Sequence, residues 1–263
     1  MTTTTPTALA APAASGRFGR ATRAHLANET RLLLREPAAL IFGAVLPLAA
    51  IIVMTAIPAA RQPLADFGGL SVVQNYAPTI TLFATSVIGL TIMPGTLGGY
   101  REGGVLRRLR TTPASPATLL TALFLLMAAA GLVVAGLIVA IPAVGGAGLP
   151  TNLGWFALAA AGSLAAFLAL GAVLAAVVPN PKAAAGVGNL IAALMWFAAG
   201  LWVPRFAFPD WLKAVTDLTP GGAAAQAMLE ATHGLAVSWQ PYAVLAAWTI
   251  VAAFIAVRTF RWE

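Results

Sequence analysis

Long apolar segments alternate with short polar ones along most of the chain. Six apolar segments approach the roughly 20 residues that a transmembrane helix needs. They lie at about residues 38–58, 76–98, 117–141, 153–178, 183–203 and 241–259. Glycine and proline clusters at 144–150 and 179–182 separate the third segment from the fourth and the fourth from the fifth. We therefore predict an all-α polytopic membrane protein whose six-span domain covers residues 37–263.

The residues before the first span divide into two parts. Residues 1–16 are rich in Thr, Ala and Pro without a basic stretch or an apolar core, which predicts a disordered tail rather than a signal peptide. Residues 17–36 predict an amphipathic interfacial helix that lies among lipid headgroups. Its apolar side holds Phe18, Leu26, Leu32 and Leu33, and its basic side holds Arg17, Arg20, Arg31 and Arg35. It is either a simple anchor or a helix that transmits motion.

The segment before the last span, residues 204–240, is too apolar for a solvated loop. We expect it to form short helices that enter the outer leaflet and pack against the spans. Irregular backbone at that depth must be buried in protein or line a cavity. This predicts an outer re-entrant segment before the last span.

The composition supports a membrane protein and excludes some functions. Hydrophobic residues make up 60% of the chain and charged residues 9%, against about 25% charged in soluble domains. The formal net charge of +7 comes from residues at span ends, not from one basic face, so we expect no nucleic-acid partner. The absence of cysteine excludes disulfides and thiolate metal sites. The abundance of Arg, Ala, Gly and Pro suggests a GC-rich bacterium.

The distribution of the 15 basic residues predicts the orientation in a bacterial plasma (inner) membrane. With the N-terminus inside, twelve fall on the cytoplasmic side: Arg17, Arg20, Arg23, Arg31, Arg35, Arg101, Arg107, Arg108, Arg110, Lys182, Arg258 and Arg261. The other three, Arg61, Arg205 and Lys213, fall outside. Both termini are then cytoplasmic, as an even number of spans requires.

Several kinds of chemistry have no sequence signal. The chain has no G-x-x-x-x-G-K-[ST] phosphate loop, no Rossmann glycine signature, no H-E-x-x-H motif and no G-x-S-x-G elbow. His25 and His233 are predicted on opposite sides of the membrane, so they cannot share a metal. The predicted spans contain no acidic residue, and Arg258 near the end of the last one is their only basic residue, which argues against proton-coupled transport and an intramembrane enzyme. We expect no cofactor, metal or catalytic residue in this chain.

Polar residues inside the predicted spans are few. Thr79, Thr81, Thr85, Ser86 and Thr91 in the second span are expected to bond back to their own helix or to a neighbouring helix. Asn189 is the more suggestive residue, since an amide in hydrocarbon needs a partner. It lies either at a helix interface or along a pathway.

The loop at residues 99–116 is the most informative segment. No charged residue occurs between Asp66 and Arg101, or between Arg110 and Lys182, so this charged loop must lie outside the hydrocarbon. On a helical wheel Val105, Leu106 and Leu109 form an apolar stripe. Glu102 falls on the same side, and we expect it to pair with Arg31 or Arg35 of the N-terminal helix. The alternative is a topology loop whose charges are solvated.

Two motifs resemble a known family. Arg101-Glu102, Leu106, Leu109, Thr112-Pro113 and Ser115 are similar to the loop after the second span in membrane subunits of type-2 ATP-binding-cassette exporters, the class that includes bacterial drug-resistance exporters. Phe208-Pro209-Asp210-Trp211-Leu212 with Leu218-Thr219-Pro220 resembles that family's re-entrant region. The chain departs from the family at Gly221-Gly222-Ala223, where an aromatic residue is common.

The resemblance implies that two permease copies, here a homodimer, pair with two separate nucleotide-binding ATPase subunits, which carry ATP and Mg²⁺. The loop at 99–116 would be the coupling helix. The residues implied to contact the ATPase are Arg101, Glu102, Val105, Leu106, Arg108 and Leu109. The pathway would run between the copies, with spans two and five nearest the axis. The residues implied to line it are Phe83, Asn189, Met195 and Phe197.

The function expected from these observations is export of a hydrophobic or amphipathic compound, a drug-like molecule or a lipid. Two alternatives stay open. One is export of a polysaccharide or other polymer, and the other is a non-transport assembly or sensory module of the membrane.

Overall fold

The computed structural model describes residues 14–105 and 116–259, so residues 1–13, 106–115 and 260–263 lie outside the description that follows. All named elements in the described ranges are helical, and no strand is formed there. Before the charged loop these elements are α1 (Ala14–Leu33), α2 (Pro37–Leu40), η1 (Ile41–Val45), α3 (Leu46–Ala56), η2 (Pro58–Arg61), η3 (Ala65–Phe67), α4 (Val72–Ser86), η4 (Val87–Ile92) and α5 (Met93–Glu102). After the loop they are α7 (Pro116–Val144), α8 (Leu153–Val177), α9 (Pro181–Ala198), η5 (Arg205–Ala207), α10 (Asp210–Asp217), α11 (Pro220–His233) and α12 (Trp239–Thr259).

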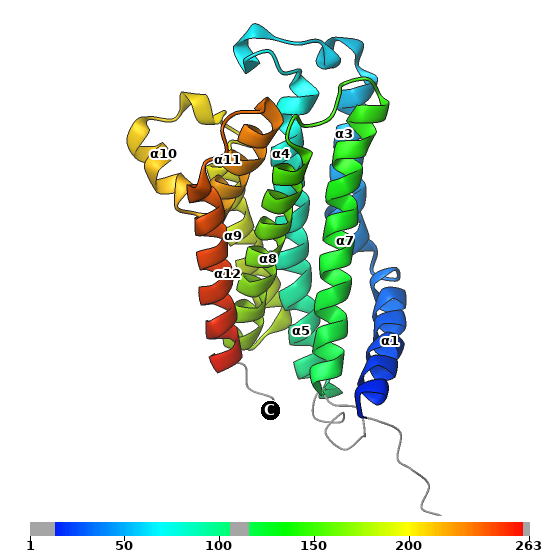
Figure 1. Cartoon of the computed structure of the whole chain (residues 1–263). Helices are drawn as coiled ribbons and strands as arrows, with labels where there is room; N and C mark the ends of the chain where they lie inside the picture. Colours follow the sequence, from blue (N-terminus) through cyan, green and yellow to red (C-terminus); the bar gives the residue numbers. More distant parts are fainter. Residues whose placement is uncertain (1–13, 106–115, 260–263) are drawn as a thin grey trace, which may run out of the picture.

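The long helices stand side by side as a bundle (Figure 1). Helix α1 and the last residues of α12 lie at the lower end, and α10 and α11 lie at the upper end. Helix α1 runs beside the lower half of α7 and packs against it. Since no membrane is present, its expected position among lipid headgroups stays a prediction.

Five helices in the described ranges are long and apolar enough to cross a membrane. They are Pro37–Ala56, Val72–Glu102, Thr118–Val144, Leu153–Val177 and Trp239–Thr259. The expected span at 183–203 corresponds to α9, an 18-residue helix that is not among the five. Lys182, Asn189 and the glycines at 186 and 188 lower the hydropathy of the first half of α9. The structure thus has helices that are long and apolar enough to span a membrane, and the count of six spans stays a prediction.

The helix from Val72 to Glu102 contains a wide turn near its middle. A reciprocal capping box opens it: the Ser71 hydroxyl accepts from the Gln74 amide (3.2 Å), and the Gln74 side chain accepts from the Ser71 amide (3.0 Å). The segment η4 is π-helical and ends just before Pro94. Proline has no amide hydrogen and crowds the carbonyl four residues earlier, so a π-helical turn relieves the conflict.

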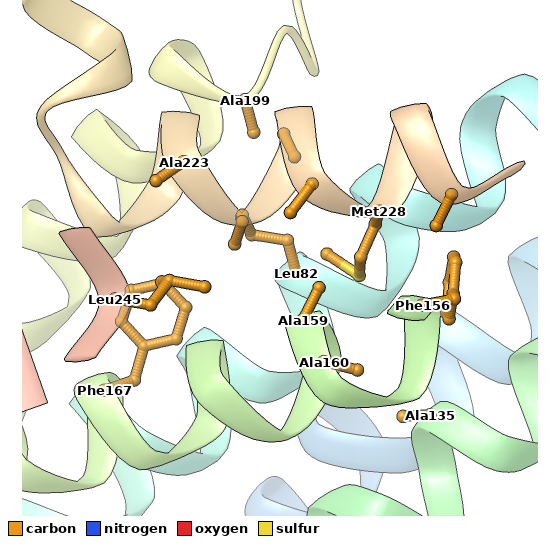
Figure 2. Close-up of a cluster of buried hydrophobic side chains, with 14 of the residues drawn as sticks. Leu82, Ala135, Phe156, Ala159, Ala160, Phe167, Ala199, Ala223, Met228 and Leu245 are labelled. Atoms are coloured by element: carbon orange, nitrogen blue, oxygen red, sulfur yellow. The ribbon is translucent and has the colours of Figure 1, made fainter. Parts of the chain in front are cut away.

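The largest buried cluster is built mainly from small side chains at the junction of α4, α8, α11 and α12 (Figure 2). Alanines of α8 and α11 face one another, and Phe167, Met228 and Leu245 fill the remaining space. Lipid tails are as apolar as these side chains, so packing in a bilayer depends on close van der Waals contact. Small residues permit that contact.

Helix α11 is almost entirely buried on its small-residue side. The glycines at 221 and 222, where the resembled family often has an aromatic residue, face backbone atoms of Met195 and Thr216 that leave no room for a side chain. The Thr219 hydroxyl caps the helix by accepting from the Gly222 amide (3.1 Å). The expected short helices at 204–240 are therefore present as α10 and α11. Their position in the outer leaflet stays a prediction.

Candidate functional site

The last turn of α5 leads into the charged loop, and its side chains reach two other helices. Arg101 turns toward the end of α8. Its guanidinium donates to the carbonyl oxygens of Ala175 (2.9 Å) and Ala176 (3.3 Å), and to those of Val178 and Pro179 (2.8 Å each). A helix leaves its last carbonyls without backbone donors, and its C-terminus attracts cations. Arg101 therefore caps α8.

The sequence at the end of α8 explains why this cap is needed. In a continuous helix the amide of residue 179 would bond to the carbonyl of Ala175, but Pro179 has no amide hydrogen. The guanidinium supplies the missing donor. Arg101 thus fixes the beginning of the charged loop to the turn between α8 and α9.

Tyr100 fixes the same turn of α5 to α1. Its hydroxyl donates to a carboxylate oxygen of Glu29, a side chain that is only 3% exposed. Sequence reasoning missed this pair. The signal was present, because Glu29 lies three residues after Leu26 and four before Leu33, on the apolar side of the amphipathic helix.

The other residues expected at the coupling loop are more exposed. Glu102 is exposed, Val105 is half-buried, and Arg31 and Arg35 are exposed. Among the described side chains, no ion pair joins Glu102 to either arginine. Leu106, Arg108 and Leu109 lie outside the described residues. The carboxylate that ties the N-terminal helix to α5 is that of Glu29 instead of Glu102.

The expected pathway residues divide between two faces. Phe83 of α4 lies beside Trp196 of α9, with ring centroids 4.7 Å apart. Nearer the lower end of the same helices, the Thr91 hydroxyl donates to the Asn189 side-chain oxygen (3.0 Å). Asn189 is exposed on the bundle surface. Phe83 and Asn189 therefore belong to one face formed by α4, η4 and α9, which we call the α4/α9 face.

Met195 and Phe197, which flank Trp196 in α9, make contacts outside the α4/α9 face. Met195 packs against the alanine-rich core, and Phe197 stacks on Phe208 with centroids 5.4 Å apart. Trp196, which sequence reasoning missed, donates from its indole nitrogen to the Ser86 hydroxyl (2.7 Å).

Hydroxyls elsewhere in the bundle behave as expected. The Thr81, Thr85 and Ser86 hydroxyls bond back to carbonyls of their own helix. This confirms the prediction for these three residues. In the ranges that the structure covers, no group of three or more His, Asp or Glu side chains could hold a metal ion.

A bundle of long apolar helices with buried small residues, bonded hydroxyls and charged groups at its two ends defines a polytopic helical membrane protein. Residues 20–258 match the family described as "ABC-2 family transporter protein". The chain belongs to this family and is an ABC-2 type permease subunit, the membrane subunit of an ABC transporter. Such subunits normally lack ATPase motifs and work with a separate ATPase subunit. No curated protein matches the chain closely.

Proposed function

We propose that the chain is the permease of an ATP-driven exporter that moves a hydrophobic or amphipathic compound out of a bacterial cytoplasm. The observation that carries the proposal is the double anchorage of the last turn of α5. Tyr100 holds it to α1 and Arg101 holds it to α8. A displacement of the charged loop would therefore move three helices together.

In this proposal a separate subunit binds ATP and Mg²⁺, and the loop at 99–116 is its contact. Arg101 serves as the positioning residue at the beginning of the loop, because its guanidinium is occupied by α8. Glu102 and Val105, with Leu106, Arg108 and Leu109 beyond them, form the surface toward the ATPase. Closure of the ATPase dimer then pushes the loop and, through it, the helices that border the pathway.

The α4/α9 face supports a pathway between two copies of the chain. It joins aromatic rings, at Phe83 and Trp196, to a single polar pair, Thr91 and Asn189. A surface of this kind favours an apolar or amphipathic compound over an ion, because it offers no charge to replace the hydration of an ion. Drug-like molecules and lipids fit this description.

The distribution of charge supports the orientation. The ends of α5 and α12, with Arg101 and Arg258, lie at the lower end of the bundle, and η2 and α10 lie at the upper end (Figure 1). By the excess of basic residues, the lower end faces the cytoplasm in a bacterial inner membrane. Both termini are then cytoplasmic.

The test is efflux from proteoliposomes that hold the permease and its ATPase subunit. We expect Glu102→Ala and Val105→Asp to reduce ATP-driven efflux at least tenfold while the permease still inserts as a folded protein. Lys182→Ala is the matched control, since Lys182 is an exposed cation at the neighbouring α8–α9 turn. It should leave efflux unchanged.

Three outcomes contradict the proposal. Normal efflux by both loop variants would mean that the loop does not couple the subunits. A permease that binds no ATPase subunit and supports no efflux would favour the assembly or sensory module. Transport of long saccharide chains in the same assay, with no efflux of small amphipathic compounds, would identify a polymer exporter.

A further inference from the structure

A cavity of about 500 Å³ lies between α1, α5 and α7 near the lower end of the bundle. Its volume is within the range typical of small-molecule sites, roughly 300–1,000 Å³. Two glycines of α5, Gly95 and Gly99, line the cavity, and a Cβ atom added at Gly99 would meet nothing within 4 Å. The cavity is therefore open space and not a gap filled by side chains.

The lining of this cavity has two chemically different parts. Leu123, Leu126 and Met127 of α7, with Leu32 and Leu33 of α1, make one part apolar. Glu29, Arg35, Glu36 and Tyr100 make the other part polar. Two carboxylates against one guanidinium leave the polar part with a formal charge of −1. This arrangement suits a molecule that has an apolar body and a cationic head.

The state of Glu29 adds a second, independent argument. The side chain is 3% exposed, yet its bonding partner is the neutral Tyr100 hydroxyl, and it forms no ion pair with any described side chain. A buried carboxylate without a cation is unfavourable, and removal from water strengthens its attraction for one. Arg35 and Glu36 lie at the exposed rim, where water screens their charges.

We propose that this cavity binds an amphipathic molecule with an ammonium head. The ammonium lies against the Glu29 carboxylate, and the apolar body lies on the Leu123, Leu126 and Met127 wall. A lipid with an amine headgroup and a free amphipathic amine share this chemistry. The proposal deepens the proposed function, on which its consequence for transport rests: the cavity would be where a compound is collected from the cytoplasmic leaflet.

The experiment measures binding to the purified full-length permease in nanodiscs of phosphatidylglycerol, a lipid without an ammonium group. One probe is a fluorescent alkylammonium, and the other has the same chain with a hydroxyl head. We expect Glu29→Gln to weaken alkylammonium binding at least tenfold and to leave the hydroxyl probe unchanged, because glutamine can still accept from Tyr100 but has no charge. Glu36→Gln should weaken it less, as expected for a rim residue.

A second pair of variants tests the location without changing charge. Gly99→Phe should block both probes by filling the cavity. Gly136→Phe is the matched control, because a Cβ atom at Gly136 also meets nothing within 4 Å, and Gly136 does not line this cavity. The control for the loss of a carboxylate in Glu29→Gln is Asp210→Asn, since Asp210 is fully exposed in α10. Both controls should bind like the unmodified protein.

Competition by phosphatidylethanolamine shows whether the ammonium group that the cavity binds comes from a lipid headgroup or from a free amphipathic amine. Displacement of the alkylammonium probe identifies the lipid headgroup as the occupant, and lack of displacement identifies the free amine. The proposal is overturned if Glu29→Gln and Gly99→Phe both bind the alkylammonium as tightly as the unmodified protein does. It is also overturned if the hydroxyl probe binds equally well. Because no ATPase is present in this assay, the two proposals can fail separately. Binding can be absent while ATP-driven efflux persists, and efflux can be absent while binding persists.

Discussion

Arg101 shows how one side chain can serve two parts of the protein. It stands at the beginning of the charged loop, yet its guanidinium is used to complete the end of α8. Hydrogen bonds that involve a charged donor contribute about 1.5–3 kcal/mol to stability. The carbonyls that it bonds, at 175, 176, 178 and 179, diverge around the end of the helix, so a planar, forked donor fits them and a point charge does not.

At the residue scale we therefore predict that Arg101→Ala lowers the free energy of unfolding by about 2–3 kcal/mol. Arg101→Lys should recover less than half of that loss, because an ammonium cannot reach all four carbonyls at once. Denaturant titration of the purified permease in detergent measures both values. Lys182→Ala removes an exposed cation from the same turn and should change stability by less than about 0.5 kcal/mol. Equal stability of the lysine variant and the unmodified protein would contradict the capping role.

The sequence predicted that Arg101 lies in a loop outside the hydrocarbon, but not that its guanidinium bonds to the end of α8. A charged residue between two apolar segments marks a loop near the membrane surface, and that part of the prediction follows from hydropathy alone. The carbonyls that Arg101 reaches are 74 to 78 residues away along the chain. The contact of Tyr100 with Glu29 spans 71 residues. Helical periodicity describes one helix at a time, so it cannot predict which helices meet.

Among the elements, the wide turn η4 packs closely against both α8 and α9. The Met93 amide bonds to the Ile88 carbonyl, and Pro94 has no amide, so the Gly89 carbonyl loses its usual donor within the helix. This carbonyl lies against Gly171 of α8, and the next one, of Leu90, lies against Gly188 of α9. Contacts between Cα–H groups and carbonyl oxygens are weakly favourable and are common where helices touch.

We predict that Gly171→Ala and Gly188→Ala each lower the free energy of unfolding by at least about 2 kcal/mol. The added methyl group would overlap a backbone carbonyl of η4, which cannot move without opening the π-helical turn. Thermal unfolding in detergent and the yield of folded protein measure the effect. Gly186→Ala is the control on the same helix, because its methyl group meets nothing within 4 Å. It should be neutral or stabilising by about 0.5–1 kcal/mol, and a similar loss in all three variants would refute the close-contact explanation.

Hydropathy predicted the long helices well, because each must bury its backbone bonds along a stretch of apolar residues. It did not predict η1 and η4. Each π-helical segment ends one residue before a Leu-Pro or Met-Pro pair, so proline within an apolar segment was the available signal. It predicted α9 as a span, although Asn189 and the glycines that permit its contacts lower its hydropathy and α9 is not among the five helices that are apolar enough to cross a membrane. The features that let α9 pack closely are the same ones that make it a weak membrane span by composition.

For the whole molecule, the exposed residues of α9 suggest where a second copy lies. Val187, Leu190 and Leu194 are exposed at helical spacing on this helix, next to the exposed Asn189. An exposed amide held by one hydrogen bond is unfavourable in contact with lipid tails and acceptable in a polar pathway. The proposed pathway between two copies, at the α4/α9 face, would account for both features.

The chain contains no cysteine, so single-cysteine variants report this arrangement directly. We predict that Leu190→Cys, 64% exposed in the single chain, forms a disulfide-linked dimer when native membranes are treated with a mild oxidant. A disulfide requires Cα atoms within about 7 Å, so only residues near the two-fold axis qualify. Ile250→Cys on α12 is the matched control, with 68% exposure, and should stay monomeric on a non-reducing gel. Cross-linking of Ile250→Cys without that of Leu190→Cys would move the axis to α12 and separate the pathway from Asn189.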